Sequence, residues 1–233
     1  MGTFKMTISE LLPLIGTAYA PDIVDICLAD DHALDPRIIP GARRMSFQSV
    51  AKSDLGTAQL CVVVCKKGYK LSQGSVGVLR AEGRQARFLE GGVLAWANAD
   101  LPLWPTALHP TIGAYKSDWV LPHALTPDDL FAAWIILRWL DPSARWLFVE
   151  RDQISLVCEN FGAHSPRDVA DTLLATGTIL AQDLHALRDT AQQPSLAGLL
   201  QGACKVAPRS AAGLMGAAMI FDSLWAVREG GAQ

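Results

Sequence analysis

Residues 60–71 run from an apolar segment through a lysine-rich turn into a further segment, Leu60-Cys61-Val62-Val63-Val64-Cys65-Lys66-Lys67-Gly68-Tyr69-Lys70-Leu71. The β-branched run Val62–Val64 is typical of a parallel strand that is buried on both faces. Gly68 allows the tight backbone turn that follows, and residues 71–79 favour a helix. The stretch therefore predicts a strand, a short loop and a helix, with Cys65 at the end of the strand.

Strand and helix signals alternate on both sides of this stretch. Residues 23–26 and 86–89 read as strands, and Gly91-Gly92 closes the second of them. Alternation of this kind is typical of a parallel α/β sheet flanked by helices. We therefore expect an α/β domain over residues 1–104.

Beyond this domain the sequence becomes rich in proline, with Pro102, Pro105, Pro110, Pro122 and Pro127. We interpret residues 105–125 as a linker. Thr126-Pro127 then forms a helix start, with acidic residues in the first turn, and apolar helical patterns continue to the end of the chain. Residues 126–233 are thus predicted to form a mainly α-helical domain.

Composition excludes several kinds of partner. The 233 residues contain 20 Lys and Arg against 23 Asp and Glu, a formal net charge of -3, so there is no basic surplus for nucleic acid. No run reaches the ~20 apolar residues that span a membrane. Residues 5–20 loosely resemble a signal peptide, but Glu10 and Pro13 argue against one, and the segment reads equally well as a short helix capped at Thr7 or Ser9. An odd number of cysteines, five, indicates a reducing compartment, and we expect a cytoplasmic protein. The oligomeric state stays open.

Positive charge gathers around one thiol. Three of the seven lysines, Lys66, Lys67 and Lys70, follow Cys65 within five positions. A cysteine between a strand and a helix start lies where backbone N–H groups converge, and these groups together with the lysines favour the thiolate. Such a sulfur is a nucleophile that needs no metal or cofactor. The alternative is that Cys65 is a small apolar residue at the end of a buried strand.

No metal site is predicted. The five histidines are scattered without the spacing of zinc ligands.

Residues 62–72 resemble the active-site loop of rhodanese-like sulfurtransferases. Three further segments resemble motifs of that family in the same order, over residues 7–104 in all: Val24-Asp25, Ile39-Pro40-Gly41-Ala42, and Leu89-Glu90-Gly91-Gly92 with Trp96 and Leu101-Pro102. The resemblance implies a rhodanese-like α/β fold.

The resemblance also implies a reaction. Only four residues separate Cys65 from Lys70, as in members that use sulfane sulfur, whereas related phosphatases and arsenate reductases have a longer loop. The lysines of this loop resemble those of family members that use thiosulfate, whose loops are cationic. The implied function is transfer of sulfur from thiosulfate, through a Cys65 persulfide, to a thiol or cyanide. Asp25 is implied to orient the loop, and the implied substrate-binding residues are Lys66, Lys67, Gly68, Tyr69 and Lys70.

Two positions depart from the family pattern. Lys70 stands where the loop commonly ends in arginine, which keeps the charge but loses bidentate geometry. Cys27 stands where arginine commonly follows the aspartate. Cys27 is either a resolving thiol for Cys65 or a filler, and the sequence leaves both readings open.

The second half shows a further resemblance. Asp128, Trp134, Arg138 and Asp141-Pro142 are similar to the opening of the C-terminal domain of chromate-resistance proteins. This resemblance suggests the alternative function, a regulatory protein that senses a persulfide or an oxyanion. The other interpretation of this half is a helical domain with a structural role.

Overall fold

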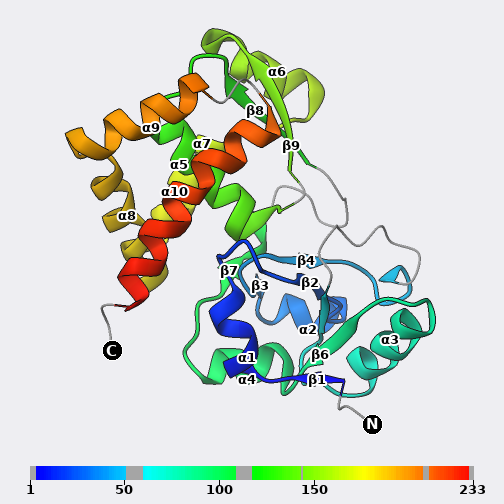
Figure 1. The fold of residues 1–233 in the computed structure, drawn as a ribbon. Helices are drawn as coiled ribbons and strands as arrows, with labels where there is room; N and C mark the ends of the chain where they lie inside the picture. The colour runs from blue at the N-terminus through cyan, green and yellow to red at the C-terminus, as the bar shows by residue number, and fades with distance from the viewer. Residues whose placement is uncertain (1–3, 51–59, 109–116, 143, 207–209, 231–233) are drawn as a thin grey trace. The chain divides into compact units, whose positions relative to one another are not determined.

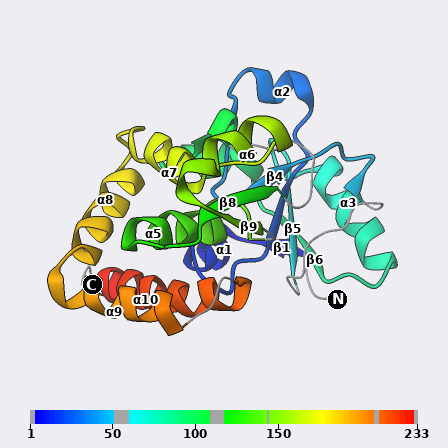
Figure 2. The same cartoon turned by 90° about the horizontal axis from the view of Figure 1, so that it is seen from above.

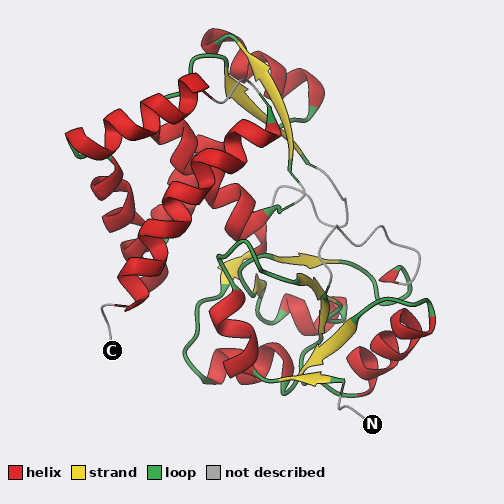
Figure 3. Cartoon of the chain, viewed as in Figure 1, coloured by secondary structure: helices red, strands yellow, loops and turns green. Residues whose placement is uncertain are grey.

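The computed structural model describes residues 4–50, 60–108, 117–142, 144–206 and 210–230 (Figure 1). The chain divides into two compact units. Unit 1 comprises residues 1–115 with 138–143, and unit 2 comprises residues 116–137 with 144–233. Figure 3 shows that strands are concentrated in the first unit and helices in the second.

A parallel sheet forms the centre of unit 1. Its strand order is β1-β6-β5-β2-β4, and all the neighbouring pairs run parallel. The strands are β1 (Lys5–Met6), β2 (Asp22–Asp25), β4 (Ala42–Arg44), β5 (Cys61–Val64) and β6 (Ala86–Leu89). Every residue of β5 is buried, as its β-branched run predicts, because it is the middle strand and both faces are covered.

Helices lie on both sides of this sheet. Figures 1 and 2 show α3 on one side and α1 on the other. Val76 and Leu79 of α3 pack with Val24, Val63 and Ala86 of the sheet in one buried cluster. The helices of unit 1 are α1 (Ile8–Leu11), α2 (Ala29–Ala33), α3 (Lys70–Ala81) and α4 (Gly92–Asn98), with 3₁₀ turns η1 (Leu12–Leu14) and η3 (Thr106–Leu108).

The end of the sheet domain is held by a buried tryptophan. Trp96 of α4 has no exposed surface, and its indole N–H donates to the Pro102 carbonyl at 2.9 Å. The chain then continues into β7 (Trp104–Pro105), which pairs antiparallel with β3 (Arg37–Ile38). The hydrogen bond between Trp96 and Pro102 therefore holds the segment after α4 against unit 1, where β7 pairs with β3.

Unit 2 is built around α5. Strands β8 (Asp118–Pro122) and β9 (Arg145–Val149) form a two-stranded parallel sheet. The helices are α5 (Pro127–Ile135), α6 (Ile154–Phe161), α7 (Pro166–Leu174), α8 (Ile179–Ala191), α9 (Pro194–Val206) and α10 (Ala211–Gly230), with the 3₁₀ turn η5 (Arg151–Gln153). The π-helical segment η4 (Ile136–Leu140) follows α5, and its last three residues are counted with unit 1. Residues of α5 are buried almost throughout, as its apolar sequence predicts.

Aromatic rings and one buried carboxylate fix α5. Phe131 and Trp134 contact Phe221 of α10 at centroid distances of 5.7 and 5.8 Å. Asp129 is 1% exposed and caps the helix through Thr126. Its two oxygens are also paired with Arg151 at 2.7 Å and Arg167 at 2.8 Å. Burial alone would raise the pKa of Asp129, but these partners outweigh it and lower the pKa.

The predicted fold class, a parallel-sheet α/β part followed by a helix-rich part, is confirmed. Two details differ from the sequence analysis. The stretch interpreted as a linker contains β8, which accommodates Pro122 because β8 belongs to a two-stranded sheet and the next residue, His123, donates its N–H to Val149 of β9. The helix that starts after Thr126 is α-helical only to Ile135 and continues as a π-helical segment over Ile136–Leu140, which the apolar sequence pattern does not indicate. No helix in the described ranges is long and apolar enough to cross a membrane.

Asp129→Asn is expected to destabilise the protein by about 3 kcal/mol at neutral pH, because it leaves two guanidinium groups against an uncharged partner. The folded-state pKa of Asp129 lies below its unfolded value, so the carboxylate stabilises the fold above about pH 4. That stabilisation is lost as the pH falls through the folded pKa. The difference between the two proteins in urea denaturation should therefore shrink on acidification.

The neighbouring Asp128→Asn is the matched control, because Asp128 side-chain exposure is 29% and its loss should cost less. A difference between wild type and Asp129→Asn that is the same at pH 7 and pH 3 would contradict the assignment.

Candidate active site

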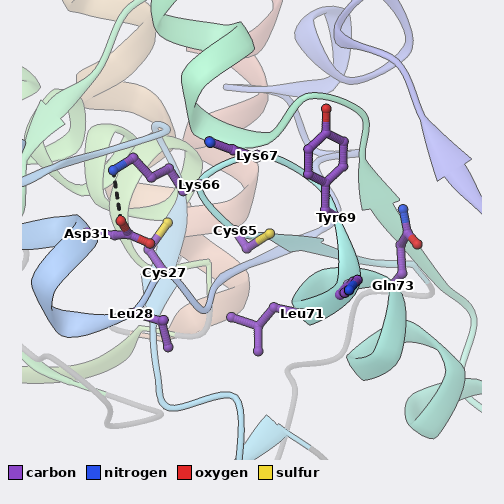
Figure 4. Close-up of a pocket in the computed structure, with 10 residues that line it drawn as sticks. Cys27, Leu28, Asp31, Cys65, Lys66, Lys67, Tyr69, Leu71 and Gln73 are labelled. Atoms are coloured by element: carbon purple, nitrogen blue, oxygen red, sulfur yellow. Dashed lines mark hydrogen bonds and ion pairs between the residues drawn. The ribbon is translucent and has the colours of Figure 1, made fainter.

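Cys65 follows directly after β5, at the carboxyl end of the sheet. Its side chain is largely buried, with 6% exposure, yet it lines a cavity of about 600 Å³. The crevice beyond the carboxyl ends of parallel strands is the usual ligand site of open α/β sheets. The cavity lining comprises Cys27, Leu28, Asp31, Cys65, Lys66, Lys67, Tyr69, Lys70, Leu71 and Gln73 (Figure 4).

The loop after Cys65 is docked against the start of α4. The N–H groups of Val93 and Leu94 donate to the carbonyls of Cys65 and Lys66 at 3.1 and 3.0 Å. This close backbone approach requires glycine at two positions. Gly68 and Gly92 have φ of +66° and +60°, and a Cβ on Gly92 would overlap the Cys65 carbonyl oxygen and lie 2.7 Å from the Gly68 nitrogen.

A buried hydroxyl contacts the sulfur. Ser72, in the first turn of α3, has no exposed surface, and the Cys65 thiol donates to its Oγ at 3.3 Å. The Ser72 hydroxyl in turn donates to the Tyr69 carbonyl at 3.1 Å. This pair of bonds fixes the sulfur against the end of the loop. Since a hydroxyl can rotate, Ser72 can also donate to a Cys65 thiolate.

The cationic side chains surround the cavity. Lys66, Lys67 and Lys70 all line it, as does the exposed Tyr69. Lys66 Nζ lies 2.8 Å from Asp31 Oδ1 of α2, across the cavity from the loop (Figure 4). Within the described residues, Lys67 and Lys70 form no ion pair. The cavity therefore presents an excess of positive charge beside the sulfur.

Asp25 organises the opposite wall. It is 1% exposed, accepts a hydrogen bond from the Cys27 N–H at 2.7 Å, and lies 3.6 Å from the Arg44 guanidinium. Arg44 also donates to the Cys27 carbonyl at 3.1 Å. Position 27 is a cysteine in this chain, so it offers Asp25 no cation. Arg44 of β4 supplies the guanidinium that pairs with Asp25 instead. The result is a fixed backbone where Cys27 and Leu28 face the cavity.

The remaining thiols are held protonated at neutral pH. Burial, reinforced by the nearby Asp25 charge, strongly raises the pKa of Cys27. Burial raises the pKa of Cys61 to about 12, and it also raises the pKa values of Cys158 and Cys204. Because the thiolate is the reactive form, these four cysteines are poor nucleophiles. All five cysteines are free.

The structure brings Cys65 and four of the five expected substrate-binding residues to this cavity. Cys65, Lys66, Lys67, Tyr69 and Lys70 line it, and Gly68, the fifth, forms the loop turn. Asp25 supports the facing wall by accepting the hydrogen bond of the Cys27 N–H. Within the described ranges, no three potential metal ligands gather at one place.

Sequence reasoning missed Asp31, Ser72 and Arg44. Ser72 had a local signal, because it is a hydroxyl residue in the first turn of the predicted helix that follows the cysteine. Asp31 and Arg44 had none, because they lie far from Cys65 in the sequence and reach the site only through the sheet topology.

Solved structures of rhodanese-like proteins are similar to the N-terminal ~40% of the chain. A rhodanese-related protein from Thermoplasma volcanium is 17% identical, with a TM-score of 0.37 over 42% of this chain and 95% of that one. A rhodanese-like domain protein from Staphylococcus aureus is 26% identical, with a TM-score of 0.35 over 40% of this chain and 89% of that one. A thiosulfate sulfurtransferase from Pseudomonas aeruginosa is 28% identical, with a TM-score of 0.34 over 42% of this chain and 19% of that one. No protein-family model and no curated protein matches the chain.

Gly92→Ala is expected to loosen the loop that carries Cys65, because the added methyl group collides with the loop backbone. Gly83→Ala is the matched control: Gly83 also has a positive φ, +81°, but nothing lies within 4 Å of its Cβ position. In urea denaturation, Gly83→Ala should lower the free energy of unfolding by about 1 kcal/mol through backbone strain. Gly92→Ala should lower it by more. Equal destabilisation by the two variants would contradict the docking role of Gly92.

Proposed function

We propose that unit 1 is a sulfurtransferase that carries sulfane sulfur on Cys65. The observation that carries the proposal is the position of Cys65, which lies at the carboxyl end of β5 with its sulfur on a cavity lined by Lys66, Lys67 and Lys70. The loop motif and the three further motifs that resemble the rhodanese-like family support it. The preferred donor is thiosulfate, and the acceptor is a thiol or cyanide.

In the first half-reaction the Cys65 thiolate attacks the outer sulfur of thiosulfate. A bond forms between Sγ and that sulfur, the bond between the two thiosulfate sulfurs breaks, and sulfite leaves with the electron pair. The product is a Cys65 persulfide. Preorganised donors at a developing negative charge are the most effective form of stabilisation. The loop N–H groups from Lys66 to Lys70 and the Ser72 hydroxyl take this role.

In the second half-reaction an acceptor attacks the outer sulfur of the persulfide and Cys65 leaves as a thiolate. The donor and the acceptor bind in turn to the same cavity, so the kinetics are ping-pong. Positive charge beside the sulfur raises the local concentration of anions. Lys67 and Lys70 are the lysines best placed for this, since Lys66 is paired with Asp31.

Other groups at the site have supporting roles in this proposal. Tyr69 and Gly68 shape the loop, and Asp25 holds the wall that faces it. Cys27 acts as a neutral wall residue rather than as a resolving thiol, because its raised pKa keeps it protonated. Phosphate-ester hydrolysis is the competing chemistry, and the short loop between Cys65 and Lys70 disfavours it.

Cys65→Ser is expected to reduce thiosulfate:cyanide sulfur transfer to the uncatalysed background, because a hydroxyl forms no persulfide. Cys27→Ser is expected to keep most of the activity. Thiocyanate formation measures both variants.

Activity that survives in Cys65→Ser would overturn the proposal. Loss of activity in Cys27→Ser would instead make Cys27 a participant. Hydrolysis of an aryl phosphate that depends on Cys65 would support the competing chemistry.

A further inference from the structure

The cavity is much larger than the proposed donor. Its volume is about 600 Å³, whereas a five-atom anion occupies roughly 150 Å³ at about 30 Å³ for each water-sized atom. Leu28 and Leu71 add apolar wall to the charged groups. The cavity therefore has room for a second substrate that is larger than thiosulfate. The charges that line the cavity indicate the chemical class of that substrate.

The charges are of both signs and lie on facing walls. Lys66 and Lys67 come from the loop side, and Asp31 comes from α2 (Figure 4). Lys70, the first residue of α3, also lines the cavity. Asp31 and Lys66 are paired at 2.8 Å, and the side chain of each is 36% exposed, so a ligand can reach both. Asp30, the adjacent residue of α2, is exposed to solvent and does not line the cavity.

We infer that the sulfur acceptor is a small zwitterionic thiol, an amino-acid thiol with an ammonium group and a carboxylate. Its ammonium group pairs with Asp31, and its carboxylate pairs with the Lys66 that Asp31 releases. One ion pair within the protein is thus exchanged for two with the ligand. A purely anionic thiol meets the repulsion of Asp31 instead. The inference rests on the proposed function, because it names the second substrate of the same site.

The chemical step is a displacement without net oxidation or reduction. The acceptor thiol loses its proton to solvent, and its sulfur attacks the outer sulfur of the Cys65 persulfide. A bond forms between these two sulfurs, and the bond from the outer sulfur to Cys65 Sγ breaks. Cys65 leaves as a thiolate and the acceptor becomes a persulfide.

The experiment separates the two half-reactions. The full chain is first loaded with thiosulfate, freed of excess donor, and checked by intact mass for one added sulfur. The loaded protein is then discharged with cysteine, with 3-mercaptopropionate, which lacks the ammonium group, or with cysteamine, which lacks the carboxylate. Discharge rates are compared for each acceptor across variants, so that differences in acceptor thiol pKa cancel.

Asp31→Asn should slow discharge by cysteine and by cysteamine roughly threefold to tenfold, the size expected for one unit charge in a partly exposed cavity. Discharge by 3-mercaptopropionate should stay the same or become faster. Asp30→Asn removes the same charge from the same helix turn and should leave all three rates unchanged. Lys66→Met should slow discharge by cysteine and by 3-mercaptopropionate but not discharge by cysteamine.

The acceptor assignment alone would be overturned if the persulfide forms and the three acceptors discharge it at the same relative rates in wild type and in Asp31→Asn. An equal effect of Asp30→Asn and Asp31→Asn would also overturn it, since only long-range charge would then be involved. Absence of any sulfur on Cys65 after thiosulfate would overturn the proposed function, and the acceptor assignment with it.

Discussion

The close approach of two backbones, the loop after Cys65 and the first turn of α4, is the constraint on which the candidate site depends. Val93 and Leu94 donate to the carbonyls of that loop, and the approach is possible only because position 92 has no side chain. With its carbonyls held in this way, the loop keeps Cys65 at the end of the middle strand. Two segments that lie far apart in the sequence therefore define one rigid cradle.

The charges at the cavity come from the loop itself and from the helix that faces it. The loop carries three lysines, and α2 contributes the carboxylate of Asp31 on the facing wall. Asp25 and Arg44 fix the wall segment between β2 and α2, so the distance across the cavity is set by the sheet rather than by flexible side chains. The Cys65 thiol, the lysines that follow it and a carboxylate of opposite charge thus line one crevice.

Much of this arrangement could be predicted from local patterns. The buried run before Cys65, the glycine turn and the lysine cluster each have a local physical meaning, and together they placed the loop on a parallel sheet. Contacts between distant segments could not be predicted. Asp31 reads as an ordinary acidic residue in a first helical turn, and Arg44 as an ordinary cation. In unit 2 the prolines around β8 concealed a strand, since β8 accommodates Pro122 only because it belongs to a two-stranded sheet, in which each strand has an open edge.

The mass of the intact protein shows whether Cys65 carries sulfane sulfur. After incubation with thiosulfate, the mass should rise by one sulfur atom, which peptide mapping should place on Cys65. Cyanide should then remove that sulfur and restore the original mass. An unchanged mass after thiosulfate, or a sulfur atom on another cysteine, would rule out this role for Cys65.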